Sequence, residues 1–506
     1  MAFKYKLDNV LDKVRPKLPD NMLFFMDPEV NLGQFCARNE IITPRNAVNI
    51  TSQGEVEFNV PANRTDFINM NELKLKMTIS LNKKDNFAWI QDENSDPKTV
   101  ENITYASGME ESKTELAVPI DAFLQTQWKD VSLSLNGVSI NHSNHDFPHR
   151  TYMDILLRTS EDQQPRLEYD WLFYKSFQSK RGDEPNPYVS KDVAGIKRSR
   201  RTRGGHQIQL SGRIWTDFLK NPKLLLPSGV AMNILLSPAT DKFRFNITPE
   251  NLMENFDYRI EDISLEVQWI RLSPNAASSV INMMNKYTIP YPFTRTEFKV
   301  FPLNKGRNEF HVTELFKENV PLDLVLGMVN VDAYYGNMKS DPFFFKRNYL
   351  ETASFSVNGY SIPGKELKFT ANPRIINRKT LTDEENIANL EDQQKNKAEY
   401  DIIDKSNEWA MEALHSLWNV AGTSVNGFNM DTYKDGNFLI AIQTEPTVPP
   451  DIPYWPSPKT GNTTLKLTFS KPLESEQQLL VLARFPSIVT ITNGSTPNSP
   501  RVVECY

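Results

Sequence analysis

The sequence predicts an all-β protein built from two β-sandwiches in tandem. Three observations support this prediction: many segments alternate polar and apolar residues, helical periodicity is scarce, and one hairpin signal occurs twice at an offset close to half the chain. At 506 residues the chain is too long for a single core. Its 33 prolines outnumber its 20 glycines and punctuate short segments, as in all-β chains with long loops.

The alternating segments are the strand signals. Glu72–Leu81 alternates throughout, so a strand there places all its apolar side chains on one face, and Ile263–Trp269 repeats the pattern. Leu479–Phe485 and Ile488–Ile491 predict two further buried strands. Shorter segments of the same kind are Val56–Val60, Val131–Leu135 and Leu465–Phe469. Strands with one apolar face need a second layer over that face, which favours a sandwich or a barrel.

The internal repeat is a hairpin signal. Ser134–Ile140 and Ser356–Ile362 share five of seven residues at an offset of 222, and both contain Asn-Gly between alternating apolar residues. Asn-Gly is typical of a tight hairpin turn whose backbone needs positive φ. Two copies of one β module are therefore predicted, with the junction near residues 274–287, where the strand pattern breaks. Helices are predicted at Arg150–Arg158 and Glu408–Val420.

Charge and cysteine content narrow the function classes. The formal net charge of -6 disfavours a surface that wraps nucleic acid, and no sequence-specific nucleic-acid partner is predicted. Cys36 and Cys505 are the two cysteines, so no disulfide framework is available and burial has to supply the stability. The chain start lacks an apolar core of signal-peptide length, and no apolar run approaches the roughly 20 residues of a membrane span. We therefore expect folding in a reducing compartment.

Several segments, in order along the chain, resemble one family. Val325–Gly336 and Asp341–Lys346 look like the most recognisable stretch of the double jelly-roll major capsid proteins of the adenovirus-hexon lineage, and most closely those of Maverick/Polinton elements and adintoviruses. The resemblance covers residues 22–490 approximately. Other matching segments are Met22–Pro28, Gly54–Pro61, Val131–Ile140, Arg150–Tyr152, Leu224–Phe243, Arg271–Pro274 and Lys286–Phe298. Residues 178–206, read as an extra basic loop, and the long acidic region 380–420 depart from the family pattern.

The resemblance implies two eight-stranded jelly-roll sandwiches with short helices and long loops. The implied division is an N-terminal arm at residues 1–21, a first jelly roll at 22–280, a second at 281–490 and a C-terminal tail at 491–506.

A structural role follows from the same resemblance. It implies a non-enzymatic homotrimer, a pseudo-hexagonal capsomer that tiles the facets of an icosahedral DNA-virus or virus-like transposon shell. The implied partners are neighbouring capsomers, the penton (vertex) protein and minor capsid proteins, and the implied location is the virion, assembled in the host nucleus or cytoplasm. No cofactor, catalytic residue or metal ligand is assigned.

A cluster of His142, His145 and His149 with Asp146 has residue types that can ligate zinc. The competing interpretation is a polar loop before a helix, with His149 near the helix start. The spacing fits no well-defined zinc pattern, so we assign no metal site.

Three other segments have a functional and a structural interpretation. The basic run Lys197–Arg203 is either a nuclear localisation signal or an anion contact, or else a solvated loop. Arg181–Asp183 is the integrin-binding tripeptide, which also occurs by chance. The first 20 residues mix basic and apolar side chains, so they form either an arm that contacts a neighbouring capsomer or an inner membrane, or a disordered tail.

Two alternatives remain open at this point. A tandem β-sandwich carbohydrate- or receptor-binding protein would be a monomer with a concave aromatic site. A metal-dependent cupin-like enzyme would need paired histidines along a barrel strand together with a distant acid and histidine. The sequence shows neither that arrangement nor a nucleophile and base pair.

Overall fold

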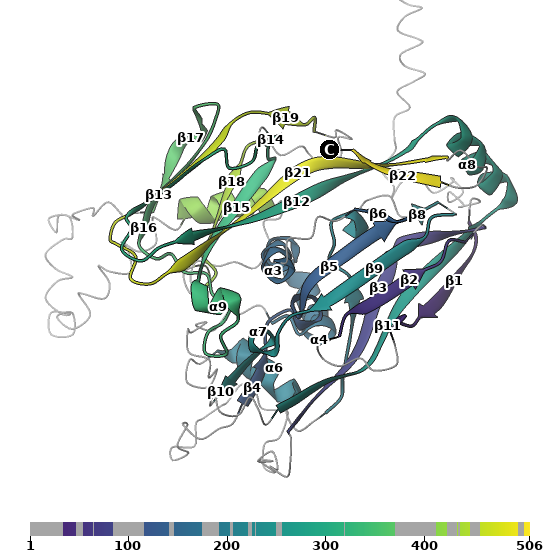
Figure 1. The fold of residues 1–506 in the computed structure, drawn as a ribbon, viewed down its shortest axis with the longest axis horizontal. Coiled ribbons are helices and arrows are strands. Elements are labelled where there is room, and N and C mark those ends of the chain that lie inside the picture. The colour runs from purple at the N-terminus through teal and green to yellow at the C-terminus, as the bar shows by residue number, and fades with distance from the viewer. Residues whose placement is uncertain are drawn as a thin grey trace, which may run out of the picture.

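The computed structural model confirms an all-β chain with short helices (Figure 1). It describes residues 34–46, 54–63, 65–83, 116–140, 146–174, 192–202, 206–220, 225–227, 229–248, 256–317, 319–369, 411–421, 433, 436–445, 456–493 and 500–505.

Two facing antiparallel sheets form the first sandwich. One has the order β1-β11-β3-β7, and the other has the order β2-β9-β5-β6. Two short additions are β8, which pairs with β3, and the separate ribbon of β4 and β10. The strands are β1 (Gln34–Ile42), β2 (Val56–Val60), β3 (Asp66–Lys83), β4 (Leu116–Pro119), β5 (Trp128–Leu135), β6 (Val138–Ser139), β7 (Ile208–Arg213), β8 (Leu225–Leu226), β9 (Met232–Pro238), β10 (Phe245–Thr248) and β11 (Phe256–Leu272).

The second sandwich repeats this plan. Its sheets have the orders β12-β21-β15-β18 and β13-β20-β16-β17, with β22 on β21 and a small ribbon of β14 and β19. The strands are β12 (Ile289–Leu303), β13 (Glu309–Thr313), β14 (Asn319–Val320), β15 (Asp323–Asn330), β16 (Leu350–Val357), β17 (Tyr360–Lys368), β18 (Leu439–Gln443), β19 (Lys459–Thr460), β20 (Thr463–Phe469), β21 (Gln477–Asn493) and β22 (Pro500–Cys505).

The strand order is the same in both sandwiches. When the eight main strands of each are counted in chain order, one sheet reads first, eighth, third, sixth, and the facing sheet reads second, seventh, fourth, fifth. This is the jelly-roll arrangement, in which successive strands alternate between two packed sheets except at the hairpin of the fourth and fifth strands. The predicted fold class of two tandem eight-stranded jelly rolls is therefore confirmed.

The repeated hairpins occupy equivalent positions, between the fourth and fifth strands of each sandwich. The turn residues have nearly identical φ angles: 48° and 82° at Asn136 and Gly137, and 51° and 83° at Asn358 and Gly359. In each sandwich the asparagine Oδ1 accepts a hydrogen bond of 2.8 Å from the residue just before the seventh strand. The donor is the Ala231 amide for Asn136 and the Asn462 amide for Asn358. The sequence repeat is thus a structural repeat.

Burial follows the predicted alternation. In β3 the apolar residues Leu73, Leu75, Met77 and Ile79 are buried, while the residues between them are partly exposed. The same pattern holds in both sandwiches. The buried apolar side chains of the two sandwiches belong to one contiguous core.

One strand prediction was wrong. Leu479–Phe485 and Ile488–Ile491 belong to a single strand, β21, rather than to two. β12 pairs with β21 without interruption, whereas the other edge of β21 is shared by β15 and β22. Pro486 falls between those two partners, after Arg484 and before Ile488, where the loss of an amide donor interrupts no ladder on that edge.

The predicted helix at Arg150–Arg158 is confirmed as part of α3, and residues 411–421 are helical, overlapping the predicted Glu408–Val420 segment. The helices are α2 (Phe123–Thr126), α3 (Phe147–Arg158), α4 (Gln164–Trp171), α6 (Val193–Thr202), α7 (Asp241–Arg244), α8 (Pro274–Lys286) and α9 (Val331–Tyr335), with 3₁₀ turns η3 (Glu161–Gln163) and η5 (Phe218–Lys220). Within the described residues, none of these is long and apolar enough to span a bilayer.

Helix α8 joins the last strand of the first sandwich to the first strand of the second (Figure 1). The sequence prediction placed only a break in the strand pattern there. A start signal was present, because Ser273 caps the helix by accepting a hydrogen bond from the Ala276 amide (3.4 Å), and Pro274 occupies the first turn.

The paired hairpins lead to a prediction about stability. Replacing Gly137 or Gly359 with alanine should destabilise the affected sandwich by about 1 kcal/mol, because a Cβ meets open space at both positions and only the left-handed backbone is penalised. We expect the melting temperature of each variant to fall by about 2–4 °C. Asparagine at the same positions should be tolerated better, and unequal losses for the two alanine variants would contradict the equivalence of the turns.

Candidate functional site between the two sandwiches

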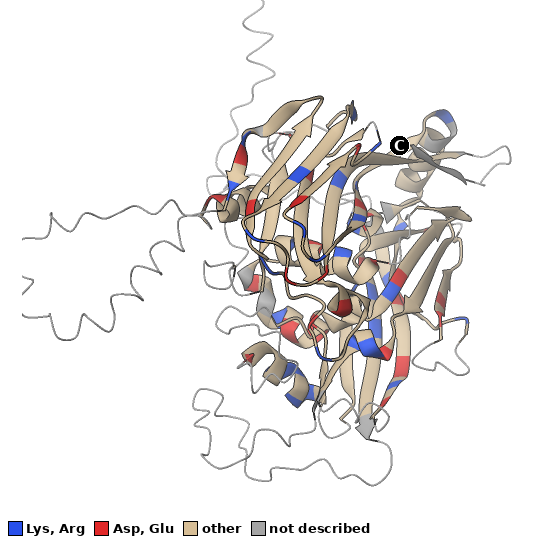
Figure 2. Cartoon of the chain, turned by 60° about the vertical axis from the view of Figure 1, so that its left-hand side comes forward, with Lys and Arg blue, Asp and Glu red and all other residues tan. Residues whose placement is uncertain are grey.

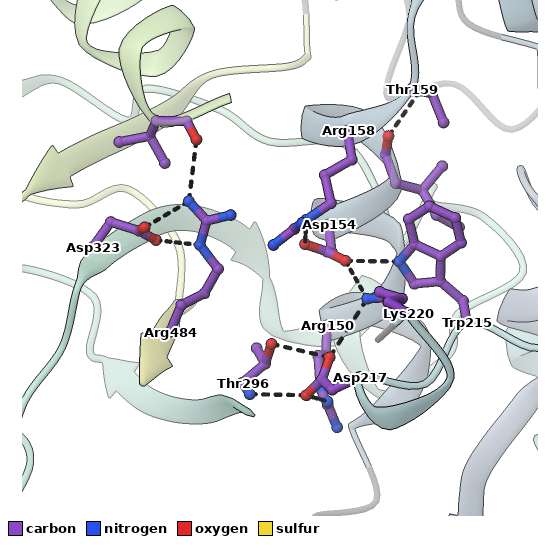
Figure 3. A network of polar contacts seen from close by, with 12 residues as sticks. Arg150, Asp154, Arg158, Thr159, Trp215, Asp217, Lys220, Thr296, Asp323 and Arg484 are labelled. Atoms are coloured by element: carbon purple, nitrogen blue, oxygen red, sulfur yellow. Dashed lines mark hydrogen bonds and ion pairs between the residues drawn. The ribbon is translucent and has the colours of Figure 1, made fainter. Parts of the chain in front are cut away.

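The two sandwiches meet across a layer of buried polar side chains (Figure 3). Helix α3 and the η5 segment belong to the first sandwich, and β12, β15 and β21 of the second face them. Figure 2 shows acidic and basic segments close together in this central region. We regard this layer as the candidate functional site because it sets how the two sandwiches are oriented.

Asp217 joins the two sandwiches directly. Its carboxylate accepts hydrogen bonds from the Thr296 amide (2.8 Å) and hydroxyl (3.2 Å) on β12. The same carboxylate forms an ion pair with Arg150 of α3 and lies 3.4 Å from the Lys220 Nζ. One buried carboxylate thus accepts hydrogen bonds from a strand of the second sandwich, and cations of the first sandwich neutralise its charge.

Asp154 lies one helical turn beyond Arg150 on α3. It accepts hydrogen bonds from the Arg158 Nε (2.7 Å), the Lys220 Nζ (2.5 Å) and the Trp215 indole (2.7 Å). Burial by itself raises the pKa of Asp154, but the charges of Arg158 and Lys220 outweigh it and hold the pKa well below its usual range. Asp154 therefore stays ionised at any physiological pH.

A third ion pair lies in the second sandwich. Arg484 of β21 binds Asp323 of β15 with two bonds of 2.5 Å each, and it donates a further bond of 3.1 Å to the Val420 carbonyl. The electrostatic influence crosses the interface, because Asp323 contributes to raising the pKa of Arg158 and Arg484 contributes to lowering that of Asp154.

The sheet register places the second-sandwich residues in one row. Thr296 is the register partner of Arg484, and Arg484 is the partner of Asp323. The row runs across β12, β21 and β15, perpendicular to the strands. The direct polar contact with the first sandwich, between Asp217 and Thr296, therefore lies at one end of this row.

Aromatic side chains continue the interface beyond this polar layer. The rings of Tyr152 on α3 and Phe343 of the second sandwich stack with centroids 4.1 Å apart and an interplanar angle of 12°. Gly336 follows α9 and lies against Phe243 of the first sandwich, where an added Cβ would come within 3.0–3.1 Å of Phe243 atoms. The close approach and the φ of 93° both require glycine at this position.

His149 lies in this aromatic region. Its ring is 2% exposed and stacks on Tyr334 with a centroid distance of 4.8 Å. Burial lowers the pKa of His149 to about 3, against a smaller opposing effect of its hydrogen bond to the Pro342 carbonyl and of Asp341. Its Nε2 has no hydrogen-bond partner. Histidine is thus held neutral by the packing between the sandwiches.

Of the other residues in the predicted histidine cluster, the structure describes Asp146. Asp146 lies just before α3 and accepts a hydrogen bond from the Tyr334 hydroxyl of the second sandwich. His142 and His145 lie outside the described residues. Among the residues that are described, no group of three His, Cys, Asp or Glu side chains is arranged to hold a metal ion.

The basic segment was wrongly predicted to be a loop. Residues Lys197–Thr202 belong to helix α6, and Arg198 is 4% exposed. Arg198 donates to the Pro119 carbonyl (2.9 Å) and pairs with Asp121 (3.4 Å), so one cation of the run anchors the helix to the first sandwich. Spacing explains the outcome, because Gly195, Arg198, Ser199 and Thr202 share one helical face and are buried. Arg203 and Arg181–Asp183 lie outside the described residues.

Sequence reasoning missed the residues of the polar layer. Arg150, Asp154 and Arg158 are spaced four residues apart on a predicted helix, which is a signal for an ion-pair row along one face. Asp217, Asp323 and Arg484 carried no comparable local signal, since their partners are distant in the sequence.

Comparison with known proteins gives the fold a family context. No family model matches the sequence. An uncharacterised protein of Caenorhabditis elegans is 23% identical over 338 residues, which cover 66% of this chain and 73% of that protein.

Solved structures share the whole architecture. PBCV-1 VP54, fitted into a reconstruction of the virophage Sputnik, is 12% identical and matches 96% of this chain and 99% of its own with a TM-score of 0.54. The Sputnik virophage structure (9% identity, 97% and 93% coverage, TM-score 0.52) and the Faustovirus major capsid protein (11%, 95% and 94%, 0.52) are similar to it as well. The chain thus has the fold of double jelly-roll major capsid proteins. The closer placement with Maverick/Polinton elements and adintoviruses stays a prediction.

The polar layer leads to a prediction about mutation. Replacing Asp154 with asparagine should destabilise the protein by about 3 kcal/mol, because it removes the buried carboxylate that pairs with Arg158 and Lys220. Chemical denaturation measures this loss. Asp170 is the matched control, since it forms an ion pair with Arg166, four residues before it on the exposed surface of α4. Asp170→Asn should cost less than about 0.5 kcal/mol, and equal losses would contradict a special role for the layer.

His149 leads to a prediction about pH. The pKa of His149 is about 6.5 when the chain is unfolded and about 3 when it is folded. The contribution of the buried, neutral His149 to stability is therefore complete above pH 6.5 and is lost as the pH falls toward 3. We expect the free energy of unfolding to fall by up to about 1.4 kcal/mol per pH unit in this window. His149→Phe should flatten the slope between pH 6 and 4, above the range in which Asp154 takes up a proton. An unchanged slope in His149→Phe would contradict this assignment.

Proposed function

We propose that the chain is a major capsid protein, a non-enzymatic building block of an icosahedral shell. The observation that carries this proposal is the equivalence of the two jelly rolls, which share strand order and hairpin geometry. Three such chains around a threefold axis present six similar barrels, and six similar barrels make a pseudo-hexagonal capsomer that can tile a flat facet.

The layer between the sandwiches supports the proposal physically. A pseudo-hexagonal block requires a fixed angle between the two barrels of each chain, because a hinge there would change the outline from copy to copy. Asp217 and the Tyr152–Phe343 stack connect the barrels by short polar and aromatic contacts that fit one relative orientation.

The same proposal includes the organisation of the chain. Residues 22–280 and 281–490 each form one barrel, with the boundary inside α8. Residues 1–21 act as an arm toward neighbouring capsomers or an inner membrane, and residues 491–506 form a C-terminal extension that includes β22. Further partners are the vertex protein and minor capsid proteins, and the location is the virion of a DNA virus or a virus-like transposon of the Polinton or adintovirus type.

The purified full chain tests this function. Native mass spectrometry should give three times the chain mass of 58.1 kDa, and negative-stain images should show particles with a hexagonal outline. Asp217→Asn, which changes the carboxylate bonded to Thr296 of the second sandwich, should weaken the trimer and blur that outline, while Asp170→Asn should behave like the unaltered chain. A monomer at micromolar concentration would sink the proposal and favour the tandem β-sandwich binding protein.

A further inference from the structure

Helix α8, at the edge of the molecule (Figure 1), has an apolar side that the described residues cover only in part. At about 3.6 residues per turn, its polar and apolar side chains separate onto two sides of the helix. Val280 on the apolar side packs against the core, where α8 contacts β21. The polar side holds Asn275, Ser278, Ser279, Asn282 and Lys286, and the apolar side holds Ala276, Ala277, Val280, Ile281 and Met283.

Three large apolar side chains of this helix are exposed. Met283 is 64% exposed, Ile281 is 37% exposed, and Tyr287, which follows the last helical residue, is 71% exposed. Single exposed apolar side chains are ordinary on a protein surface, but these three lie within two turns of one helix. They extend the apolar surface that already packs on β21, so this side of α8 can bind a further apolar segment.

The described part of the chain begins beside this helix. Gln34, the first residue of β1, is the register partner of Leu272, which directly precedes the Ser273 cap of α8. Residues 27–33 separate β1 from Met22–Met26, a segment without a polar side chain. A linker of that length spans at most about 25 Å, and α8 with its 13 residues is about 20 Å long. Met22–Met26 can therefore reach any part of the helix.

Charge and tethering both favour this segment over other occupants. The one charged residue of α8 is Lys286, which is exposed, and the carboxylates of Asp27 and Glu29 come just after the apolar segment. An exposed pair of opposite charges adds a small attraction to the apolar contact. The short linker has the larger effect, because it holds the segment at an effective concentration in the millimolar range, far above that of a second copy in dilute solution.

We propose that Met22–Met26 binds the exposed apolar side of α8 in the same chain. Met283 and Tyr287 would contact the methionine and phenylalanine side chains of the segment, since thioethers and aromatic rings pack favourably on one another. The segment would then cross the linker between the two sandwiches, and the arm of residues 1–21 would begin at that linker. The proposal does not depend on the capsid role, because it concerns contacts within one chain.

Oxidation of the purified full chain by hydrogen peroxide tests the proposal, because an exposed thioether oxidises more readily than a covered one. Met411, 41% exposed on the helix at residues 411–421, is the matched control. With the segment bound, we expect Met283 to oxidise at least about fivefold more slowly than Met411. The double variant Phe24→Ser/Phe25→Ser should restore fast oxidation of Met283 and leave Met411 unchanged, with a melting curve to verify that the variant folds.

A photo-crosslinker locates the segment in the folded chain. Benzoylphenylalanine in place of Phe24 should form crosslinks to α8 within one chain. Tyr287→Ser should reduce their yield about fivefold, whereas Tyr360→Ser, which changes an exposed tyrosine of the β16–β17 hairpin, should not.

Three results would overturn the proposal. They are fast oxidation of Met283 in the unaltered chain, crosslinks to elements other than α8, and protection of Met283 that disappears on dilution, which would identify a second copy as the occupant. A monomer in native mass spectrometry would count against the capsid role and would leave the oxidation and crosslinking results as expected.

Discussion

The relative position of the two sandwiches depends on buried carboxylates that have no access to bulk water. Asp217 is held between Arg150 of one sandwich and the Thr296 amide of the other, and Asp154 is held between Arg158 and Lys220. Taking these charges out of water is unfavourable, so the layer contributes little net stability compared with an apolar layer of the same shape. Its contribution is specificity, because the Asp217 carboxylate accepts the Thr296 hydrogen bonds at one relative orientation and would lose them at others.

The aromatic contacts near this layer supply the favourable part of the association. Tyr152 on Phe343 and the ring of His149 on Tyr334 bury large side chains from both sandwiches. A histidine in this position is compatible with burial only while it is neutral. The same packing that joins the sandwiches therefore couples their association to proton concentration in mildly acidic conditions.

Much of the fold could be predicted from the sequence, because its signals are local. Alternation in β3 and the two Asn-Gly turns depend on neighbouring residues alone, and both were correctly read. The predictions failed where distant partners decide the outcome. β21 remains one strand across Pro486 because β12 pairs with it throughout. The basic residues of α6 lie in a helix that Arg198 anchors to the first sandwich through its ion pair with Asp121.

The candidate site was hardest to foresee for the same reason. Thr296, Arg484 and Asp323 form one row only after three strands come together in register. That row has a mechanical consequence. A force applied to α3 is transmitted to the second sandwich perpendicular to its strands. It is distributed over the paired strands β12, β21 and β15, which together resist sliding. The junction should therefore respond to sideways stress as a stiff joint, and the two sandwiches should move as one body.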